Sequence, residues 1–95
     1  MLILQQLKKY KKIYCDHFGF IESEFIPCEM CEGVAVDIHH IDSKGMGGRK
    51  SMDVIENLMA LCRECHVEYG DKKQYKTILK EIHLRRLVIL YIKKL

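Results

Sequence analysis

Two Cys-x-x-Cys pairs constrain the fold of this 95-residue chain more than any other feature of its sequence. The first pair is Cys28 and Cys31, and the second is Cys62 and Cys65. A gap of two residues lets both thiolates of a turn reach one tetrahedral zinc ion at about 2.3 Å. A chain this short buries little more than ~60% of its unfolded surface, so an ion that joins two distant turns adds considerable stability. The spacing therefore predicts a structural zinc site.

The chain reads as one ordered globular unit, because 48% of its residues are hydrophobic and it has a single proline. Its first apolar run, residues 2–4, is too short for a secretory signal, and no run approaches the ~18 apolar residues of a membrane span. We therefore expect a cytoplasmic protein without membrane contact, in which paired cysteines bind metal rather than form disulfides. The unpaired Cys15 is interpreted as a buried, unreactive thiol, with a reactive thiol as the alternative.

Hydrophobic periodicity predicts an amphipathic helix at each end of the chain. The first lies within residues 1–25 and ends near Gly19, with its lysines off the apolar stripe. The second lies within residues 72–95. Because its segment Val88–Ile92 is uniformly apolar, a strand or a contact surface for a homodimer or protein partner is also compatible with the pattern. Packing of this helix onto the first is the preferred interpretation.

Between the helices, residues 26–71 show the pattern of a strand, a loop, a second strand and a short helix. Glycines and polar residues over 43–50 indicate the loop. The expected strands are Val34–Ile38 and Leu58–Leu61, and the expected helix is Arg63–Tyr69, closed by Gly70 in a left-handed conformation. The prediction is thus an α+β fold, a single domain over 1–95 with a zinc-stapled core and flanking N- and C-terminal helices.

Three histidines remain for chemistry once the thiolates are assigned to zinc. His39 and His40 lie at the far end of the first expected strand, and His66 directly follows Cys65. Successive side chains of a strand point to opposite faces, so the adjacent pair need not compete for one ion. An imidazole with an ordinary pKa of ~6.5 is suited to accept a proton from water near neutral pH. In an alternative arrangement, His66 replaces one cysteine as a zinc ligand.

The order of these motifs resembles the HNH endonucleases of the four-cysteine zinc type. The resemblance covers residues 26 to 71 and rests on the segments Cys28–Cys31, Asp37–Ile41 and Glu56–His66. It implies a ββα-metal fold, in which a hairpin and a helix hold a divalent ion beside a scissile phosphate. Two cofactors follow from it: a structural Zn ion and a catalytic divalent ion, for which Mg, Mn, Ni and Zn are all compatible with imidazole ligands.

The same resemblance assigns roles to individual residues. It implies that His39 and His66 bind the catalytic ion and that His40 is the general base of a phosphodiester hydrolysis. Asn57 would hold the loop backbone and fix the orientation of His40, since an amide donates and accepts hydrogen bonds without adding charge.

Acidic ligands are not evident from the sequence. Asp37 and Asp42 lie near the histidine pair, and either can support a histidine, but solvated positions at a strand end are the simpler interpretation.

The implied partner is DNA, and duplex DNA in particular. A net charge of +3 is compatible with nucleic acid without requiring it. The candidate phosphate contacts are the clustered cations Lys8, Lys9, Lys11, Lys12, Arg49, Lys50, Lys72 and Lys73. Since no base-reading module is visible, we do not expect strong sequence specificity.

Two other functions fit parts of the pattern. One is a non-catalytic, zinc-stabilised nucleic-acid-binding module, in which the histidines have no chemical role. The other is a redox protein that uses its Cys-x-x-Cys pairs, which the absence of a βαβ pattern disfavours.

Overall fold

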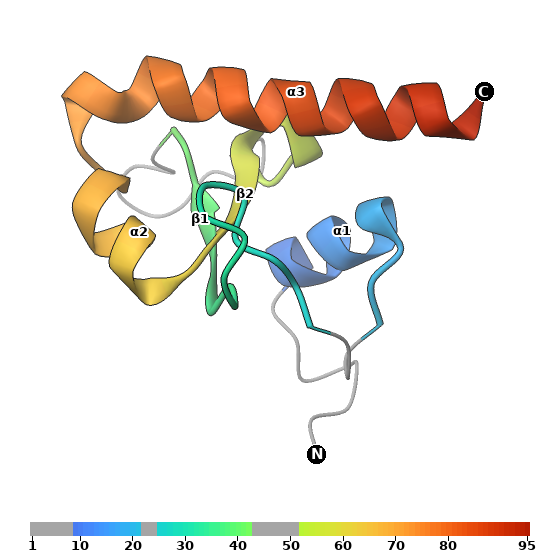
Figure 1. The fold of residues 1–95 in the computed structure, drawn as a ribbon, viewed down its shortest axis with the longest axis horizontal. Helices are drawn as coiled ribbons and strands as arrows, with labels where there is room; N and C mark the ends of the chain where they lie inside the picture. The colour runs from blue at the N-terminus through green and yellow to red at the C-terminus, as the bar shows by residue number, and fades with distance from the viewer. Residues whose placement is uncertain (1–8, 22–24, 43–51) are drawn as a thin grey trace.

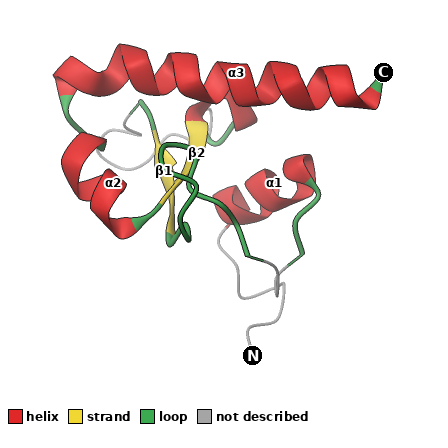
Figure 2. Cartoon of the chain, in the orientation of Figure 1, coloured by secondary structure: helices red, strands yellow, loops and turns green. Residues whose placement is uncertain are grey.

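A central two-stranded hairpin and the helices around it form the architecture of the computed structural model, which describes residues 9–21, 25–42 and 52–95 (Figures 1 and 2). The elements in chain order are α1 Lys9–Phe18, β1 Asp37–His40, the 3₁₀ turn η3 Ile55–Asn57, β2 Leu58–Leu61, α2 Arg63–Tyr69, the 3₁₀ turn η4 Lys73–Tyr75 and α3 Lys76–Lys94. Figure 1 shows α3 along one side of the hairpin, with α1 and α2 to either side of it. This arrangement confirms the predicted α+β fold with a ββα core between two helices.

The hairpin is antiparallel, with Asp37 opposite Leu61 and His40 opposite Leu58. Both histidines therefore lie inside β1 and form its far end, where the sequence placed them, but the strand begins at Asp37 rather than at Val34. The expected start of the strand is wrong because Val34 turns away to form an isolated bridge with Pro27. Because β1 is regular through His40, the adjacent imidazoles lie on opposite faces of the strand, as expected.

Strand β2 is buried on both faces and divides the core in two. On one face, Leu58 and Ala60 pack with Tyr14 of α1. On the other face, Met59 and Leu61 join a second cluster, which also contains Cys28, Ile41, Cys65 and Leu79. The period-two alternation of a strand thus sends neighbouring β2 residues into different halves of the core. A four-residue apolar strand is enough because helices cover both faces.

Helix α1 ends as predicted, near Gly19. Gly19 has φ 80, and the Phe20 N–H donates to the Cys15 carbonyl oxygen at 2.9 Å. A left-handed glycine followed by this backward hydrogen bond is a common helix ending. Residues 1–8 lie outside the described residues.

Helix α2 also ends at the predicted glycine, but for a different reason. Gly70 has φ −69, so the expected left-handed conformation is wrong, and the next residue, Asp71, takes φ 58 instead. A Cβ atom on Gly70 would lie 2.5 Å from both the Cδ2 and the carbonyl oxygen of His66. Glycine is therefore required here for a close approach to the His66 side chain, not for a positive φ.

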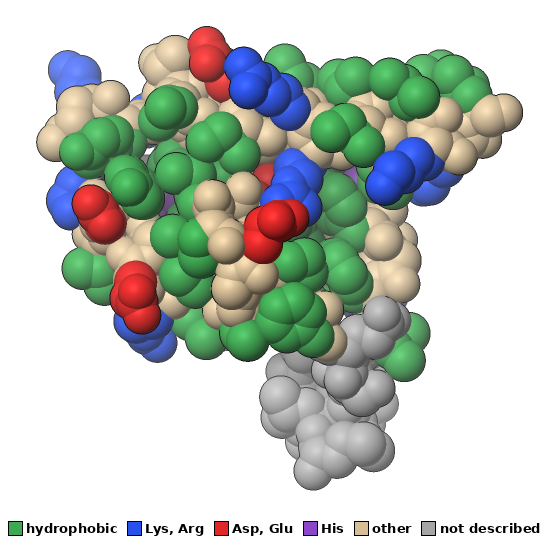
Figure 3. Space-filling view, in the orientation of Figure 1, with side chains coloured by type: hydrophobic (Ala, Val, Ile, Leu, Met, Phe, Trp, Pro, Cys, Tyr) green, Lys and Arg blue, Asp and Glu red, His purple; other side chains and the backbone are tan. Residues whose placement is uncertain are grey.

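Helix α3 continues through Val88–Ile92, so the strand alternative for this segment is wrong. It packs chiefly against η3 and η4, and it approaches α1 where the Phe18 and His83 rings are 6.5 Å apart. Exposed hydrophobic side chains follow its C-terminal half, including Val88 and Tyr91, and hydrophobic atoms line α3 in Figure 3. None of the helices in the described ranges has the length and apolarity to cross a bilayer.

A buried polar network joins five segments of the fold. The Glu29 carboxylate accepts hydrogen bonds from the Tyr14 hydroxyl at 2.7 Å and from the Ala60 N–H at 3.2 Å. His83 places Nδ1 2.8 Å from Glu29 and donates from Nε2 to the Ile55 carbonyl oxygen at 2.6 Å. Burial opposes protonation of His83, but Glu29 outweighs burial and raises the pKa of the imidazole. The network is therefore a buried ion pair with its polar atoms satisfied.

Replacing His83 with alanine should destabilise the fold by ~3 kcal/mol or more, because Glu29 would keep a buried charge without its partner. Chemical denaturation measures this loss. Arg86→Ala is the control on the same helix: it breaks the exposed Arg86 to Glu32 contact of 3.5 Å, which should contribute less than about 1 kcal/mol. Equal stability of the two variants would contradict the role given to the network.

Candidate functional site

The four paired cysteines converge on one point, as the sequence predicted. Their sulfur atoms all lie within 4.8 Å of one another. The Cys31 and Cys62 sulfurs are 3.7 Å apart, close to the ~3.8 Å edge of a tetrahedron with zinc–sulfur bonds of ~2.3 Å. The cluster therefore has the dimensions of a four-thiolate zinc site, and His66 is not needed in it.

Local backbone geometry prepares both halves of this cluster. In the first turn, the Glu32 N–H donates to the Cys28 carbonyl oxygen at 2.8 Å, and Glu32 itself takes φ 65. In the second, Cys62 is the N-cap of α2, and its sulfur accepts from the Cys65 N–H at 3.4 Å. Sulfur atoms that accept backbone N–H groups are suited to the thiolate form that metals bind.

The thiols of this cluster need a cation before all four can ionise. Burial opposes ionisation of Cys28, but backbone N–H groups outweigh it and lower the pKa of that thiol to about 7. Burial raises the pKa of Cys65 far above its ordinary value, and the neighbouring cysteine sulfurs raise it further. Four thiolates so close together repel one another unless a cation neutralises them, so a divalent metal is the natural occupant.

A second group of candidate ligands lies in an open pocket of ≈ 310 Å³, which His66 of α2 helps to line. Ligand atoms of His39, His66 and Asp71 are all within 4.8 Å of one another, and the two imidazole centroids are 4.8 Å apart. His40 also lines this pocket. The pocket thus brings together the three histidines singled out from the sequence and adds a carboxylate that the sequence did not suggest.

His39 gives the clearest physical reason to expect a metal ligand in this pocket. It is 4% exposed, and its Nε2 is the buried side-chain nitrogen without a hydrogen-bond partner among the residues that the structure describes. Burial lowers the pKa of His39, which favours the neutral imidazole with a free lone pair. Leaving a buried polar atom unpaired costs ~1–3 kcal/mol, whereas a metal ion at that nitrogen would remove the cost.

His66 is oriented by a carboxylate. Its Nδ1 lies 2.9 Å from Asp37 Oδ2, and this hydrogen bond lowers the pKa of Asp37. The contact leaves Nε2 available as a ligand atom, in the carboxylate–histidine arrangement that metal sites commonly use. Asp37 is therefore not merely a solvated strand-end residue. Asp42, in contrast, directs its carboxylate to Lys76 and Lys80.

Asp71 was missed in the sequence because it lies beyond the end of α2, five residues after His66. Its positive φ turns the chain back toward the histidines. A non-glycine residue in this conformation is uncommon and often marks a functional position. The one signal that the sequence offered for Asp71 was an acidic side chain directly after Gly70, the glycine that ends α2.

Asn57 connects the two ends of the segment between β1 and η3. Its Oδ1 accepts from the Asp42 N–H at 2.7 Å, and its Nδ2 donates to the Asp42 and Met52 carbonyl oxygens, each at 3.0 Å. His40 is bonded differently: its Nε2 lies 2.7 Å from Asp53 Oδ1. The sequence pointed to Asn57 as a backbone clamp but gave no indication of Asp53.

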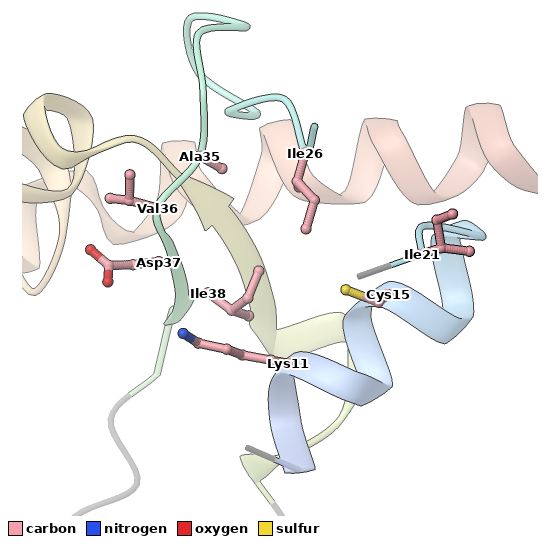
Figure 4. A pocket seen from close by; sticks show the side chains of 8 residues that line it. All are labelled: Lys11, Cys15, Ile21, Ile26, Ala35, Val36, Asp37 and Ile38. Carbon is pink, nitrogen blue, oxygen red and sulfur yellow. The ribbon is translucent and has the colours of Figure 1, made fainter. Parts of the chain in front are cut away.

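The candidate DNA contacts are dispersed. Lys11 extends from α1 toward the Asp37 side of a small apolar pocket, which Cys15 also lines (Figure 4), and its charge helps lower the pKa of Asp37. Burial raises the pKa of the Cys15 thiol, consistent with an unreactive residue. Lys12 pairs with Asp16 at 2.7 Å.

The remaining predicted cations divide into three kinds. Lys72 donates to the carbonyl oxygens of Val67 and Glu68, so its ammonium group caps α2. Lys9 and Lys73 are exposed. Lys8, Arg49 and Lys50 lie outside the described residues. On the face drawn in Figure 3, basic and acidic side chains are interspersed rather than gathered into one basic patch.

We expect the purified protein to contain one equivalent of zinc, and Cys62→Ser to lose it. Because the site joins two distant turns, zinc loss should lower the melting temperature by at least about 10 °C. Elemental analysis and thermal denaturation measure both quantities. Cys15→Ala, which changes the cysteine outside the cluster, should keep its zinc. A Cys62→Ser protein that melts like the wild type would exclude a structural metal here.

Gly70→Ala should weaken divalent-ion binding in the histidine pocket by about tenfold or more, because the added methyl group displaces His66. Calorimetric titration with Ni²⁺ or Mn²⁺ measures the affinity. Val67→Ala, at an exposed position of the same helix, is the matched control and should bind as the wild type does. Unchanged affinity in Gly70→Ala would show that His66 is not a ligand.

Comparison with known protein families agrees with this geometry. The family model described as HNH endonuclease matches residues 13–72, well over half of the chain. Neither the curated proteins nor the solved structures give a match. The matched segment contains the four clustered cysteines, the histidines of the pocket and Asp71. The chain therefore belongs to the HNH endonuclease family.

Proposed function

We propose that this protein is a metal-dependent endonuclease that hydrolyses phosphodiester bonds in DNA. The observation that supports this proposal best is the convergence of His39, His66 and Asp71 in an open pocket that a third histidine, His40, also lines. In a structural metal site the protein ligands fill the coordination sphere, whereas a catalytic site keeps a position open to solvent. The unpartnered Nε2 of buried His39 adds a physical reason for a cation at this place.

His39, His66 and Asp71 would hold the catalytic divalent ion. Three protein ligands leave coordination positions for water and for a phosphate oxygen, as an open catalytic site requires. When bound there, the ion would draw negative charge from the phosphate and from the leaving oxygen. Mg, Mn, Ni and Zn all remain candidates, since a mixed set of imidazole and carboxylate ligands is compatible with each.

His40 would be the general base. It is outside the ligand group but in the wall of the same pocket, so it can act on a water molecule that the ion does not hold. His40 and His39 lie on opposite faces of β1. The His39 ring lies beside His66, whereas the His40 ring meets the Tyr10 ring edge-on, with 4.7 Å between the ring centroids. The strand therefore gives the two imidazoles different surroundings and different tasks.

The four-cysteine site would serve catalysis indirectly. Cys62 and Cys65 fix the start of α2, and His66 is the next residue on that helix. A zinc ion at the cysteines would thus hold one ligand of the catalytic ion in place. We propose that residues 1–95 form a single domain for this reason, with the zinc site as its structural staple.

Duplex DNA would approach over the rim of the pocket. The hydrogen bond with His66 lowers the pKa of Asp37, and the charges of Arg63 and Lys11 lower it further, so these two cations would contribute to the rim on the Asp37 side. Cations at such a rim bind phosphates without reading sequence, and salt weakens the contact. We expect this activity in the cytoplasm, and a homodimer or a protein partner at the exposed side chains of α3 remains a prediction.

His40→Ala should lower the rate of nicking of supercoiled plasmid by about 100-fold or more, because water loses its base. The assay is run with a series of divalent ions, and the nicked and linear products are resolved on a gel. His17→Ala, an exposed histidine on α1, should cut at the wild-type rate. Equal nicking by wild type and His40→Ala would refute the assigned base, and no nicking with any ion would favour a non-catalytic nucleic-acid-binding module.

A further inference from the structure

The side chain of Asp53 holds the imidazole of His40. Its Nε2 lies 2.7 Å from the Oδ1 of Asp53, and the two side chains are 16% and 9% exposed. A hydrogen bond this short between partly buried groups, one of them a carboxylate, is among the stronger ones in proteins. Asp53 is absent from the wall of the histidine pocket, so it contacts His40 from behind.

This contact decides which ring nitrogen can act as a base. An ionised carboxylate only accepts hydrogen bonds, so the proton of the neutral imidazole must be on Nε2. The lone pair is then on Nδ1. Without such a partner, a neutral histidine exchanges between its two tautomers, and only one of them presents a basic nitrogen to a given point in space.

The backbone around the pair is fixed independently of the pair itself. Asn57 binds the carbonyl oxygen of Met52, directly before Asp53, and both backbone groups of Asp42, two residues after His40. The two segments are therefore held together by a buried amide, and the carboxylate meets a ring whose position is already set. Pre-set positions of this kind reduce the entropy lost in forming a hydrogen bond.

We infer that Asp53 is the positioning residue of the general base: it fixes the tautomer of His40, so that Nδ1 receives the proton. The inference rests on the proposed function of His40. In the step, an O–H bond of water breaks and its proton bonds to Nδ1, while the water oxygen bonds to phosphorus. The bond from phosphorus to the leaving oxygen breaks, that oxygen takes a proton from solvent, and Asp53 balances the charge of the imidazolium.

The test compares Asp53→Ala and Asp53→Asn in the plasmid assay. Asp53→Ala should lower kcat by about 10–100-fold with little change in KM for DNA or in melting temperature. Asp53→Asn should be no more active than Asp53→Ala, because the asparagine amide can donate to Nε2 of His40 and stabilise the opposite tautomer. Glu56→Ala, an exposed acidic residue three positions along the chain, is the control and should retain full activity.

A double-mutant cycle separates positioning from a general structural role. If Asp53 acts only through His40, Asp53→Ala should change the residual rate of the His40→Ala protein by less than about twofold. A loss of the same factor in both backgrounds would overturn the inference, because a merely structural residue would impair either protein.

Imidazole ¹⁵N NMR of the intact protein gives a readout that does not require cleavage. The wild type should show His40 with its proton on Nε2, and Asp53→Ala should show a mixture of tautomers. A wild-type His40 protonated on Nδ1 alone would overturn the inference even if the enzyme is active. If no cleavage occurs, the proposed function fails, and the NMR experiment still decides whether Asp53 sets the tautomer.

Discussion

The meeting of four cysteine sulfurs is the constraint on which the rest of this structure depends. It joins the turn at Cys28–Cys31 to the first residues of α2, two segments about thirty residues apart in a chain with only a small core. Strand β2 leads directly into that helix, so the hairpin is fixed with it. The position of every histidine in the pocket follows from this one junction. In a domain of this size, a metal staple can supply stability that hydrophobic burial alone would not.

Helix α2 is shared by two candidate metal centres of different character. Its N-terminal end carries thiolates in a compact cluster with tetrahedral dimensions, and the residue after Cys65 is His66, which lies beside His39 and an exposed carboxylate. Soft sulfur ligands in a closed set suit a permanent ion, whereas nitrogen and oxygen ligands in an open pocket suit an ion that meets a substrate. The helix has only seven residues, so any movement at one centre must reach the other. The two candidate centres therefore differ in the type of their ligands, although both include residues of one short helix.

The sequence predicted the parts of the site that depend on short-range spacing. The Cys-x-x-Cys pairs, β2 and the limits of α2 all follow from residues close together in the chain, whereas the backbone clamp at Asn57 was expected from the resemblance to the HNH endonucleases. Asp71 and Asp53 could not be predicted, because Asp71 has a positive φ and Asp53 contacts a histidine 13 residues away in the sequence. The pairing of Glu29 with His83 spans 54 residues, and nothing local distinguishes either residue from a surface charge. Gly70 was identified for the wrong reason, since its role depends on a side chain one turn earlier.

The buried Glu29 has a consequence for where this domain ends. Glu29 is part of the cysteine turn itself, and its cationic partner is on α3, outside the segment 13–72 that defines the family. A shortened chain that stopped at residue 72 would keep every candidate ligand and the proposed base His40, yet it would bury a carboxylate with nothing to neutralise it. We therefore expect that the unit needs α3 in order to fold, and that the physical domain extends beyond the segment that the family model matches.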